Sequence, residues 1–319
     1  MDLPAVEVDT PPQPWTGRND GDGAEHRRWF QAVNAGTAGD TAGSPTGGRT
    51  TALLGFRSDA GVARNKGRVG AAAAPAAIRA ALGSLAYHSE RPVADAGDIV
   101  VDGDELEGGQ ARAGRAIAAL LDAGALTCVL GGGHETAFAS YLGVAASAAV
   151  QGGKRLGVLN LDAHFDLREA PEPSSGTPFL QMAHAEAAAG RTLDYAVVGI
   201  SEPNNTRTLF DTAHRLDVKY LLDEDCSAER THGFVESFLA GVDVLYLTID
   251  LDVLPAATAP GVSAPAAYGV PLPVIAAVCR QVAESGKLLH VDVAELNPEF
   301  DIDNRTAKVA ARLLNTLLV

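Results

Sequence analysis

The chain has 319 residues, 46% of them hydrophobic, and a formal net charge of −15 at pH 7. This length is ample for a large buried core, and the acidic balance disfavours nucleic acid and anionic membrane surfaces as partners. Three widely spaced cysteines favour reduced thiols in a cytoplasmic protein, and we expect neither a signal peptide nor a membrane-spanning apolar run.

The first 49 residues are rich in Gly, Pro, Thr and Asp, and we expect them to form a loop-rich N-terminal segment. A short amphipathic helix is predicted at 25–33, and residues 36–48 have the composition of a flexible surface loop. We expect residues 50–319 to form a single domain, because no repeat and no linker interrupts them.

Apolar runs of strand length then alternate with helical patterns. The runs lie at 51–56, 96–101, 126–130, 155–160, 195–199, 218–221, 242–249 and 287–293. The helical patterns lie at 76–86, 106–123, 136–149, 178–189, 206–215, 229–240, 271–284 and 303–317. Strands that alternate with helices, and that lack an internal polar–apolar alternation, favour a mostly parallel sheet covered on both faces. The sequence therefore predicts a three-layer α/β sandwich with about eight strands between helices.

Three short polar motifs follow three of these strands. They are Gly131-Gly132-Gly133-His134-Glu135, Asp162-Ala163-His164-Phe165-Asp166 and Asp250-Leu251-Asp252. Ligands of parallel sheets bind outside the carboxyl ends of the strands, and residues two apart in an extended segment point the same way. We therefore expect six side chains to converge on one rim, namely His134, Asp162, His164, Asp166, Asp250 and Asp252.

The chemistry of this set favours a pair of divalent metal ions. The donors are carboxylates and imidazoles without a thiolate, which suits manganese better than a structural zinc site. Buried together, such groups need compensating positive charge. Taken singly, each motif has an ordinary structural interpretation, since a lone Asp pair usually caps a helix and a lone histidine usually completes a turn. Two metal ions that share a water molecule would generate hydroxide near neutral pH, which predicts a hydrolase.

With these motifs in this order, the chain resembles the ureohydrolases, which include arginase, agmatinase and formimidoylglutamase. The resemblance covers about residues 53–311 and implies an arginase-like fold with two Mn²⁺ ions per chain. It implies that His134, Asp162, Asp166 and Asp250 hold one ion. It also implies that Asp162, His164, Asp250 and Asp252 hold the other, with Asp162 and Asp250 bridging.

Three segments are most similar to formimidoylglutamase. Phe165 lies in the second metal motif and Arg168 lies two residues after it, and residues 61–71 resemble the loop after the first strand in those enzymes. Ser175 occupies the position at which arginase and agmatinase usually have a histidine, so that histidine's roles do not transfer to this chain. Ala74-Pro75 departs from the Gly-Pro that is common in the family.

This similarity implies hydrolysis of N-formimidoyl-L-glutamate to L-glutamate and formamide, in histidine degradation. The substrate has a cationic amidine and two carboxylates. The carboxylates need donors such as arginine forks, for which Asn65, Arg68 and Arg168 are the candidates, with Ser175 beside them as a further substrate contact. Arg57 and Arg64 are better explained as surface ion-pair residues.

Two catalytic residues are implied by the resemblance. Glu295, just after the last strand, would pair with the amidinium, while hydroxide bound between the metal ions attacks the amidine carbon. Asp166 would pass a proton to the departing amine of glutamate. Asp292, three residues before Glu295, is a candidate supporting residue, and His290 is expected to be a hydrogen-bonded core residue.

Three alternatives stay open. The nearest is another ureohydrolase, of the guanidinobutyrase or agmatinase kind, that releases urea from a guanidino acid. A deacetylase on a related fold is more distant, because the chain has no adjacent pair of histidines. A non-catalytic metal-binding protein is the alternative from another class. Like other members of the family, the chain is expected to form a homo-oligomer and to act on a small molecule.

Overall fold

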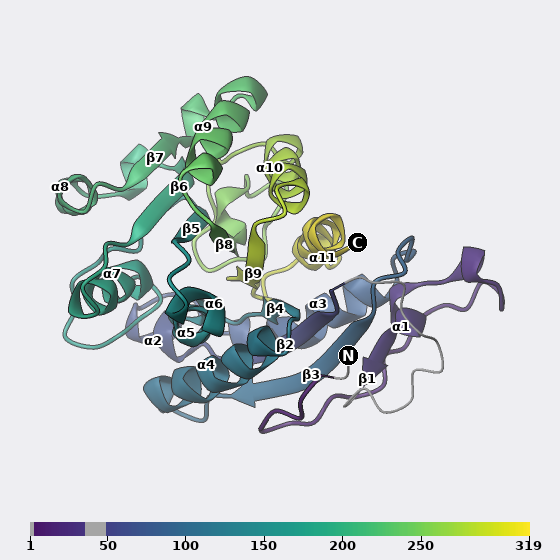
Figure 1. Ribbon diagram of the computed structural model, residues 1–319. Coiled ribbons are helices and arrows are strands. Elements are labelled where there is room, and N and C mark those ends of the chain that lie inside the picture. The colour runs from purple at the N-terminus through teal and green to yellow at the C-terminus, as the bar shows by residue number, and fades with distance from the viewer. Residues whose placement is uncertain (1–2, 36–48) are drawn as a thin grey trace.

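The computed structural model describes residues 3–35 and 49–319, and within these residues one parallel sheet lies between two layers of helices (Figure 1). The strands that the structure describes pair in the order β1-β3-β2-β4-β9-β8-β5-β6-β7. Their bounds are Val33–Ala35 (β1), Thr51–Arg57 (β2), Val93–Val100 (β3), Leu126–Leu130 (β4), Leu156–Leu161 (β5), Asp194–Ile200 (β6), Lys219–Leu222 (β7), Val244–Asp250 (β8) and Leu288–Ala294 (β9). The three-layer α/β sandwich predicted from the sequence is thus confirmed.

Helices cover both faces of the sheet. One face packs against α3 (Ala74–Gly83), α9 (Ala228–Ala240), α10 (Leu272–Glu284) and α11 (Arg305–Leu318). The other packs against α4 (Leu106–Asp122), α5 (Thr136–Ala146), α6 (Ala148–Gln151), α7 (Pro178–Ala188) and α8 (Arg207–Arg215). The short α1 (Trp29–Ala32) and α2 (Ala60–Arg64) complete the α-helices of the described ranges. Short 3-10 turns lie at Ala24–His26, Ala71–Ala73, Glu202–Asn204, Asp223–Asp225 and Leu251–Val253.

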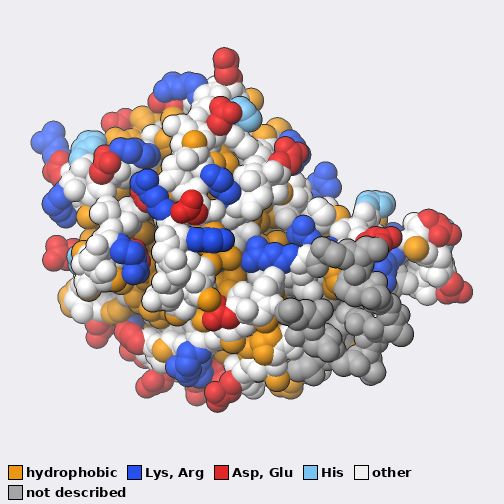
Figure 2. All heavy atoms as spheres, viewed as in Figure 1, with side chains coloured by type: hydrophobic (Ala, Val, Ile, Leu, Met, Phe, Trp, Pro, Cys, Tyr) orange, Lys and Arg blue, Asp and Glu red, His pale blue; other side chains and the backbone are white. Residues whose placement is uncertain are grey.

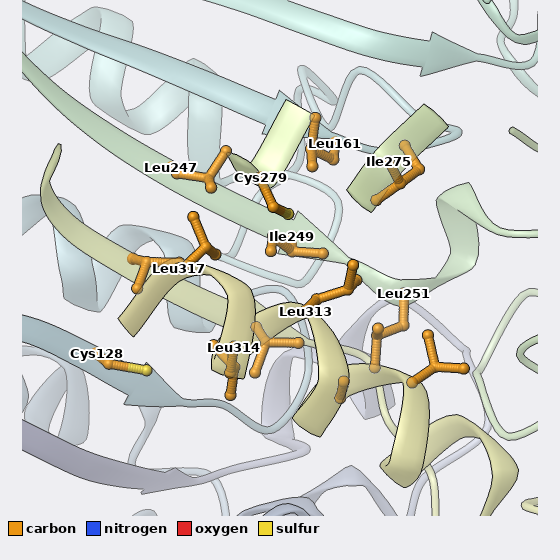
Figure 3. Packing of buried hydrophobic residues seen from close by; sticks show 14 of the residues in the cluster. Cys128, Leu161, Leu247, Ile249, Leu251, Ile275, Cys279, Leu313, Leu314 and Leu317 are labelled. Atoms are coloured by element: carbon orange, nitrogen blue, oxygen red, sulfur yellow. The ribbon is translucent and has the colours of Figure 1, made fainter. Parts of the chain in front are cut away.

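The core is aliphatic, as Figure 3 shows for the face under α10 and α11. Leu313, Leu314 and Leu317 of α11 lie over Leu247 and Ile249 of β8. All five side chains are buried. A fully buried leucine contributes about 1.5–3 kcal/mol relative to an exposed one, so this layer holds the central strands, and with them the site, in a fixed register.

All eight predicted strands are present, with boundaries shifted by three residues at most. The ninth, β1, pairs with the outer edge of β3 and has only three residues, too few to give a periodic signal. The helix predicted at 25–33 is wrong in extent, because a 3-10 turn at Ala24–His26, the four-residue α1 and then β1 occupy that stretch. The loop predicted at 36–48 lies outside the described residues.

The surface carries charged side chains of both signs, and the three cysteines are unpaired thiols. On the face shown in Figure 2, acidic side chains lie mostly around the edge and several basic side chains lie across the middle. Cys128, Cys226 and Cys279 are buried free thiols. Among the helices that the structure describes, none combines the length and the hydropathy needed to cross a bilayer.

Candidate metal centre

The sheet order brings the three motifs together. Strands β4, β9, β8 and β5 are consecutive neighbours in the sheet. His134 follows β4, the Asp162–Asp166 segment follows β5, and Asp250 is the last residue of β8. Because all of these strands are parallel, their carboxyl ends form one rim, where the sequence placed the site.

Four of the six predicted ligands form a first group around one imidazole nitrogen. His134 Nδ1 lies 2.9 Å from Asp166 Oδ2, 3.2 Å from Asp162 Oδ2 and 3.2 Å from Asp250 Oδ2. One ligand atom from each of these residues lies within 4.8 Å of all the others, a spacing that could hold a metal ion. The grouping is the one expected for the first ion.

A second group is built around His164. Its Nδ1 lies 3.0 Å from Asp252 Oδ2 and 3.5 Å from Asp162 Oδ1. Asp162, His164 and Asp252 form the second candidate ligand set. Asp162 is therefore common to both groups, through different oxygens, whereas Asp250 belongs only to the first. A bridging role for Asp250 stays a prediction.

The electrostatics of the centre call for a cation. Asp162, Asp250 and Asp252 are buried, and nowhere in residues 3–35 and 49–319 does a lysine or arginine form an ion pair with a residue of either group. Burial and the charges of Asp252 and Asp162 raise the pKa of Asp250 well above its ordinary value. Carboxylates crowded in this way ionise together only with positive charge between them, so the donor set fits divalent ions.

Local hydrogen bonds hold the aspartates in place. The backbone N–H groups of His164 and Asp252 donate to Asp162 Oδ1 (2.6 Å) and Asp250 Oδ1 (2.8 Å) respectively. Asn160 Nδ2 donates to Asp162 Oδ2 at 2.9 Å. Asp166 has a φ of 48°, in the left-handed region. Such backbone strain in a non-glycine residue persists only where the surroundings determine it, and it concentrates at functional sites.

Asn205 braces the Asp162–Asp166 segment from outside. Its Nδ2 donates to the carbonyls of Ala163 and Ser201, both at 2.9 Å, and its Oδ1 accepts from Phe165 N at 3.1 Å. The side chain is buried. Sequence reasoning missed this residue, because a lone asparagine after a helical turn has no distinguishing motif.

The glycines before His134 allow a close approach of two loops. A side-chain carbon on Gly132 would lie 1.8 Å from the carbonyl oxygen of Ser58, and Gly133 N donates to that oxygen at 3.0 Å. Ser58 Oγ in turn donates to Glu135 Oε1 at 2.7 Å, and Gly61 N donates to the same atom at 3.0 Å. The buried Glu135 thus ties the loop after β2 to the turn that carries His134.

The other ring nitrogen of His134 has its own partner. His134 Nε2 lies 3.0 Å from Thr248 Oγ1, inside the sheet. Phe179 of α7 meets the imidazole edge-on, with ring centroids 5.4 Å apart. Because Nε2 is engaged by a hydroxyl, Nδ1 is the nitrogen that faces the carboxylates.

Glu295 lies against the first group. Its Oε1 accepts from the backbone N–H of His134 at 2.7 Å, and its own N–H donates to Gly132 O at 2.8 Å. The φ of Glu295 is 68°, so this backbone too is held in the left-handed region. Burial, and then the charge of Glu135, raise the pKa of Glu295 to about 8. A nearby cation would favour its ionised form.

Two of the basic residues considered from the sequence, Arg68 and Arg64, have partners within the fold. Arg68 is engaged in the fold: its Nε donates to Ser263 O at 2.9 Å, its Nη2 donates to Val262 O, and its guanidinium lies 4.0 Å above the ring of Phe300. These contacts argue against Arg68 as a carboxylate-binding residue. Arg64 is bound by Asp104 and Glu107, which confirms its interpretation as an ion-pair residue.

Asn65, Arg168 and Ser175 come together. Asn65 Nδ2 donates to Ser175 Oγ at 3.1 Å, and the backbone N–H of Arg168 donates to Gly176 O at 2.9 Å. A side-chain carbon on Gly176 would lie 3.2 Å from both Arg168 Nε and Asn65 Nδ2. Arg168 is exposed, and its guanidinium has neither a hydrogen bond nor an ion pair to any residue in the described part of the chain. These three residues therefore form a polar group with one available cation.

Comparison with known proteins agrees with this geometry. A model of the arginase family matches residues 49–319. The chain belongs to the arginase family. It is 56% identical over 311 residues to the formimidoylglutamase of Rhodococcus opacus strain B4, covering 97% of this chain and 95% of that one. It is 48% identical over 303 residues to the formimidoylglutamase of Chromobacterium violaceum, covering 94% and 95%. The chain is thus an enzyme of a hydrolase family.

Solved structures show the same fold. The formimidoylglutamase of Bacillus subtilis superposes with a TM-score of 0.79 at 22% identity, covering 94% of each chain. The Trypanosoma cruzi formiminoglutamase with Mn²⁺ superposes with a TM-score of 0.76 at 24% identity, covering 85% of this chain and 92% of that one.

Proposed function

We propose that the chain hydrolyses N-formimidoyl-L-glutamate to L-glutamate and formamide with two Mn²⁺ ions. The observation that carries the proposal is the convergence of six candidate ligand side chains from three strand ends into two groups that share Asp162. The relatives named formimidoylglutamase, at up to 56% identity over nearly the whole chain, support the choice of substrate. We also infer a cytoplasmic homo-oligomer that takes part in histidine degradation.

His134, Asp162, Asp166 and Asp250 would hold one ion, and Asp162, His164 and Asp252, with Asp250 bridging, the other. When bound, such a pair of ions would lower the pKa of a water molecule toward the neutral range. His164 and Asp166 are the ligands that reach solvent, with side chains 24% and 14% exposed. We infer that the amidine enters from their side.

Glu295 would orient the reacting end of the substrate. Its carboxylate is fixed by the His134 N–H and by its own strained backbone, so it needs little reorganisation to accept the amidinium N–H groups. An ionised carboxylate against a cationic amidine is a charge-assisted pair that favours this substrate over a neutral amide.

Asn65, Arg168 and Ser175 would bind the carboxylates of the glutamate half. The available guanidinium of Arg168 supplies the charge, and the amide and hydroxyl of the other two supply directed hydrogen bonds. These contacts lie away from the reacting carbon, so they govern binding and alignment more than chemistry.

Asp166 would carry the proton to the departing amine. Its Oδ2 lies 2.9 Å from His134 Nδ1, and its side chain is the member of the first group most exposed to solvent. A carboxylate at the boundary between the buried group and solvent can take up a proton and release it to a neighbouring leaving group.

The test is product analysis with the purified chain and added Mn²⁺. N-formimidoyl-L-glutamate should give equimolar glutamate and formamide, and 4-guanidinobutyrate and agmatine should give no urea at comparable rates. Asp162→Asn and Asp250→Asn should lose both activity and bound manganese. Urea release as the faster reaction would favour the guanidino-acid alternative, and manganese binding without turnover of any of these compounds would favour a non-catalytic protein.

A further inference from the structure

A buried carboxylate on β9 has no role in the centre described so far. Asp292 is fully buried, and the hydroxyl of Tyr246 donates to its Oδ2 at 2.5 Å. Its Oδ1 is buried without a hydrogen-bond partner in residues 3–35 and 49–319, as are His290 Nε2 and Ser140 Oγ. In the described chain no lysine or arginine pairs with Asp292, and the nearest cationic candidate is His290 Nε2 at 3.9 Å. A carboxylate kept in such a place is costly unless its neighbours are donors.

One neighbour of Asp292, Thr248, also contacts a residue of the candidate metal centre. Thr248 is the cross-strand partner of Asp292 between β8 and β9, so both side chains lie on the same face of the sheet. Thr248 Oγ1 is the atom 3.0 Å from His134 Nε2. Burial acts to raise the pKa of Asp292, but the neighbouring side chains of His290, Ser140 and Thr248 hold the pKa below its ordinary value. Asp292 is thus the neighbour of Thr248, which is in turn the hydrogen-bond partner of His134.

The direction of the hydrogen bonds follows from the donors available. If His134 Nδ1 presents its lone pair to the rim, Nε2 carries the proton and donates it to Thr248 Oγ1. The hydroxyl proton of Thr248 then needs an acceptor, and an ionised carboxylate can only accept. Thr248 could otherwise donate to Nε2, which would move the ring proton to Nδ1 and oppose metal binding.

We propose that Asp292 is a positioning residue for His134, which accepts the Thr248 hydroxyl proton and thereby fixes the imidazole tautomer that leaves Nδ1 free for a metal ion. The proposal rests on the metal centre of the proposed function. Its predicted effect is on the affinity for one ion only, because His164 has no contact with Thr248 or Asp292 among the described hydrogen bonds. Partners of this kind typically change metal affinity about 10- to 100-fold.

The experiment measures the two stepwise Mn²⁺ dissociation constants of the metal-free chain by equilibrium dialysis. Asp292→Ala and Thr248→Val should each weaken one ion about 10- to 100-fold and leave the other within about threefold. The double variant should be no weaker than the weaker single variant, since both changes cut one hydrogen-bond chain. Thr248→Ser, which keeps the hydroxyl, should bind as the wild type.

Tyr246→Phe is the matched control. It removes the hydrogen bond that Asp292 Oδ2 accepts but leaves Thr248 beside both Asp292 and His134, so it should keep both affinities. Equal losses in Tyr246→Phe and Asp292→Ala, wild-type affinities in Asp292→Ala, or effects that multiply in the double variant would overturn the proposal. If Asp292→Ala does not fold, Thr248→Val and Thr248→Ser decide, and equal binding by these two refutes it. A wild-type chain that binds no manganese would instead refute the proposed function.

Discussion

Replacing Glu295 by glutamine separates charge from shape in the proposed amidinium site. Gln has nearly the size of Glu and keeps an acceptor oxygen for the His134 N–H, which now donates to Glu295 Oε1 at 2.7 Å. The backbone bond from Glu295 N to Gly132 O does not involve the side chain. Glu295 is in neither candidate ligand group, so the variant should hold as much manganese as the wild type.

The expected loss follows from burial. Glu295 is only 5% exposed, so its interaction with a cation is poorly screened, and the small values measured for surface ion pairs do not apply. Breaking one side of a buried ion pair costs about 3–5 kcal/mol, and the retained hydrogen-bond acceptor favours the lower end. A loss of about 3 kcal/mol corresponds to a fall of at least about 100-fold in kcat/KM.

The assay is formamide release from N-formimidoyl-L-glutamate, with manganese content measured on the same samples. Glu299→Gln is the matched control, because Glu299 lies four residues further on and is exposed, and it should leave kcat/KM unchanged. A Glu295→Gln variant with full manganese and kcat/KM within about fivefold of the wild type would show that no charge pairing occurs there.

Three further changes have distinct outcomes. Arg168→Ala should raise KM at least about tenfold and change kcat little, because uniform binding is lost; a fall in kcat at constant KM would contradict the assignment. Asn205→Ala removes three hydrogen bonds and should lower the free energy of unfolding by about 2–3 kcal/mol, measured by urea denaturation, where a loss below the error would refute the bracing role. Leu313→Ala in the fully buried layer should cost about 2–5 kcal/mol in the same assay and leave kcat of the folded enzyme intact.

The fold and the place of the centre could be predicted because strand ends carry local signals. Asp162, His164 and Asp166 follow an uninterrupted apolar run, and β5 indeed ends at Leu161 beside β8. Period-two spacing and the parallel sheet then bring these side chains to His134. Such features need only the sequence of each segment and the rule that parallel strands end at one edge.

Residues that act through distant contacts could not be predicted. Thr248 contacts His134, which lies 114 positions earlier in the sequence, and no sequence pattern distinguishes Thr248 from other threonines in strands. Arg68 was a plausible carboxylate-binding residue by its place in the loop, but the carbonyls of Val262 and Ser263 occupy its guanidinium. Such contacts depend on how loops far apart in sequence pack together, which composition and periodicity do not encode.

Anomalous diffraction at the manganese edge, from crystals grown with Mn²⁺, tests the central claim most directly. The account predicts two peaks, one among His134, Asp162, Asp166 and Asp250, and the other between His164 and Asp252, with Asp162 contacting both. Peaks remote from these side chains, or a single ion with His164 uncoordinated, would contradict it.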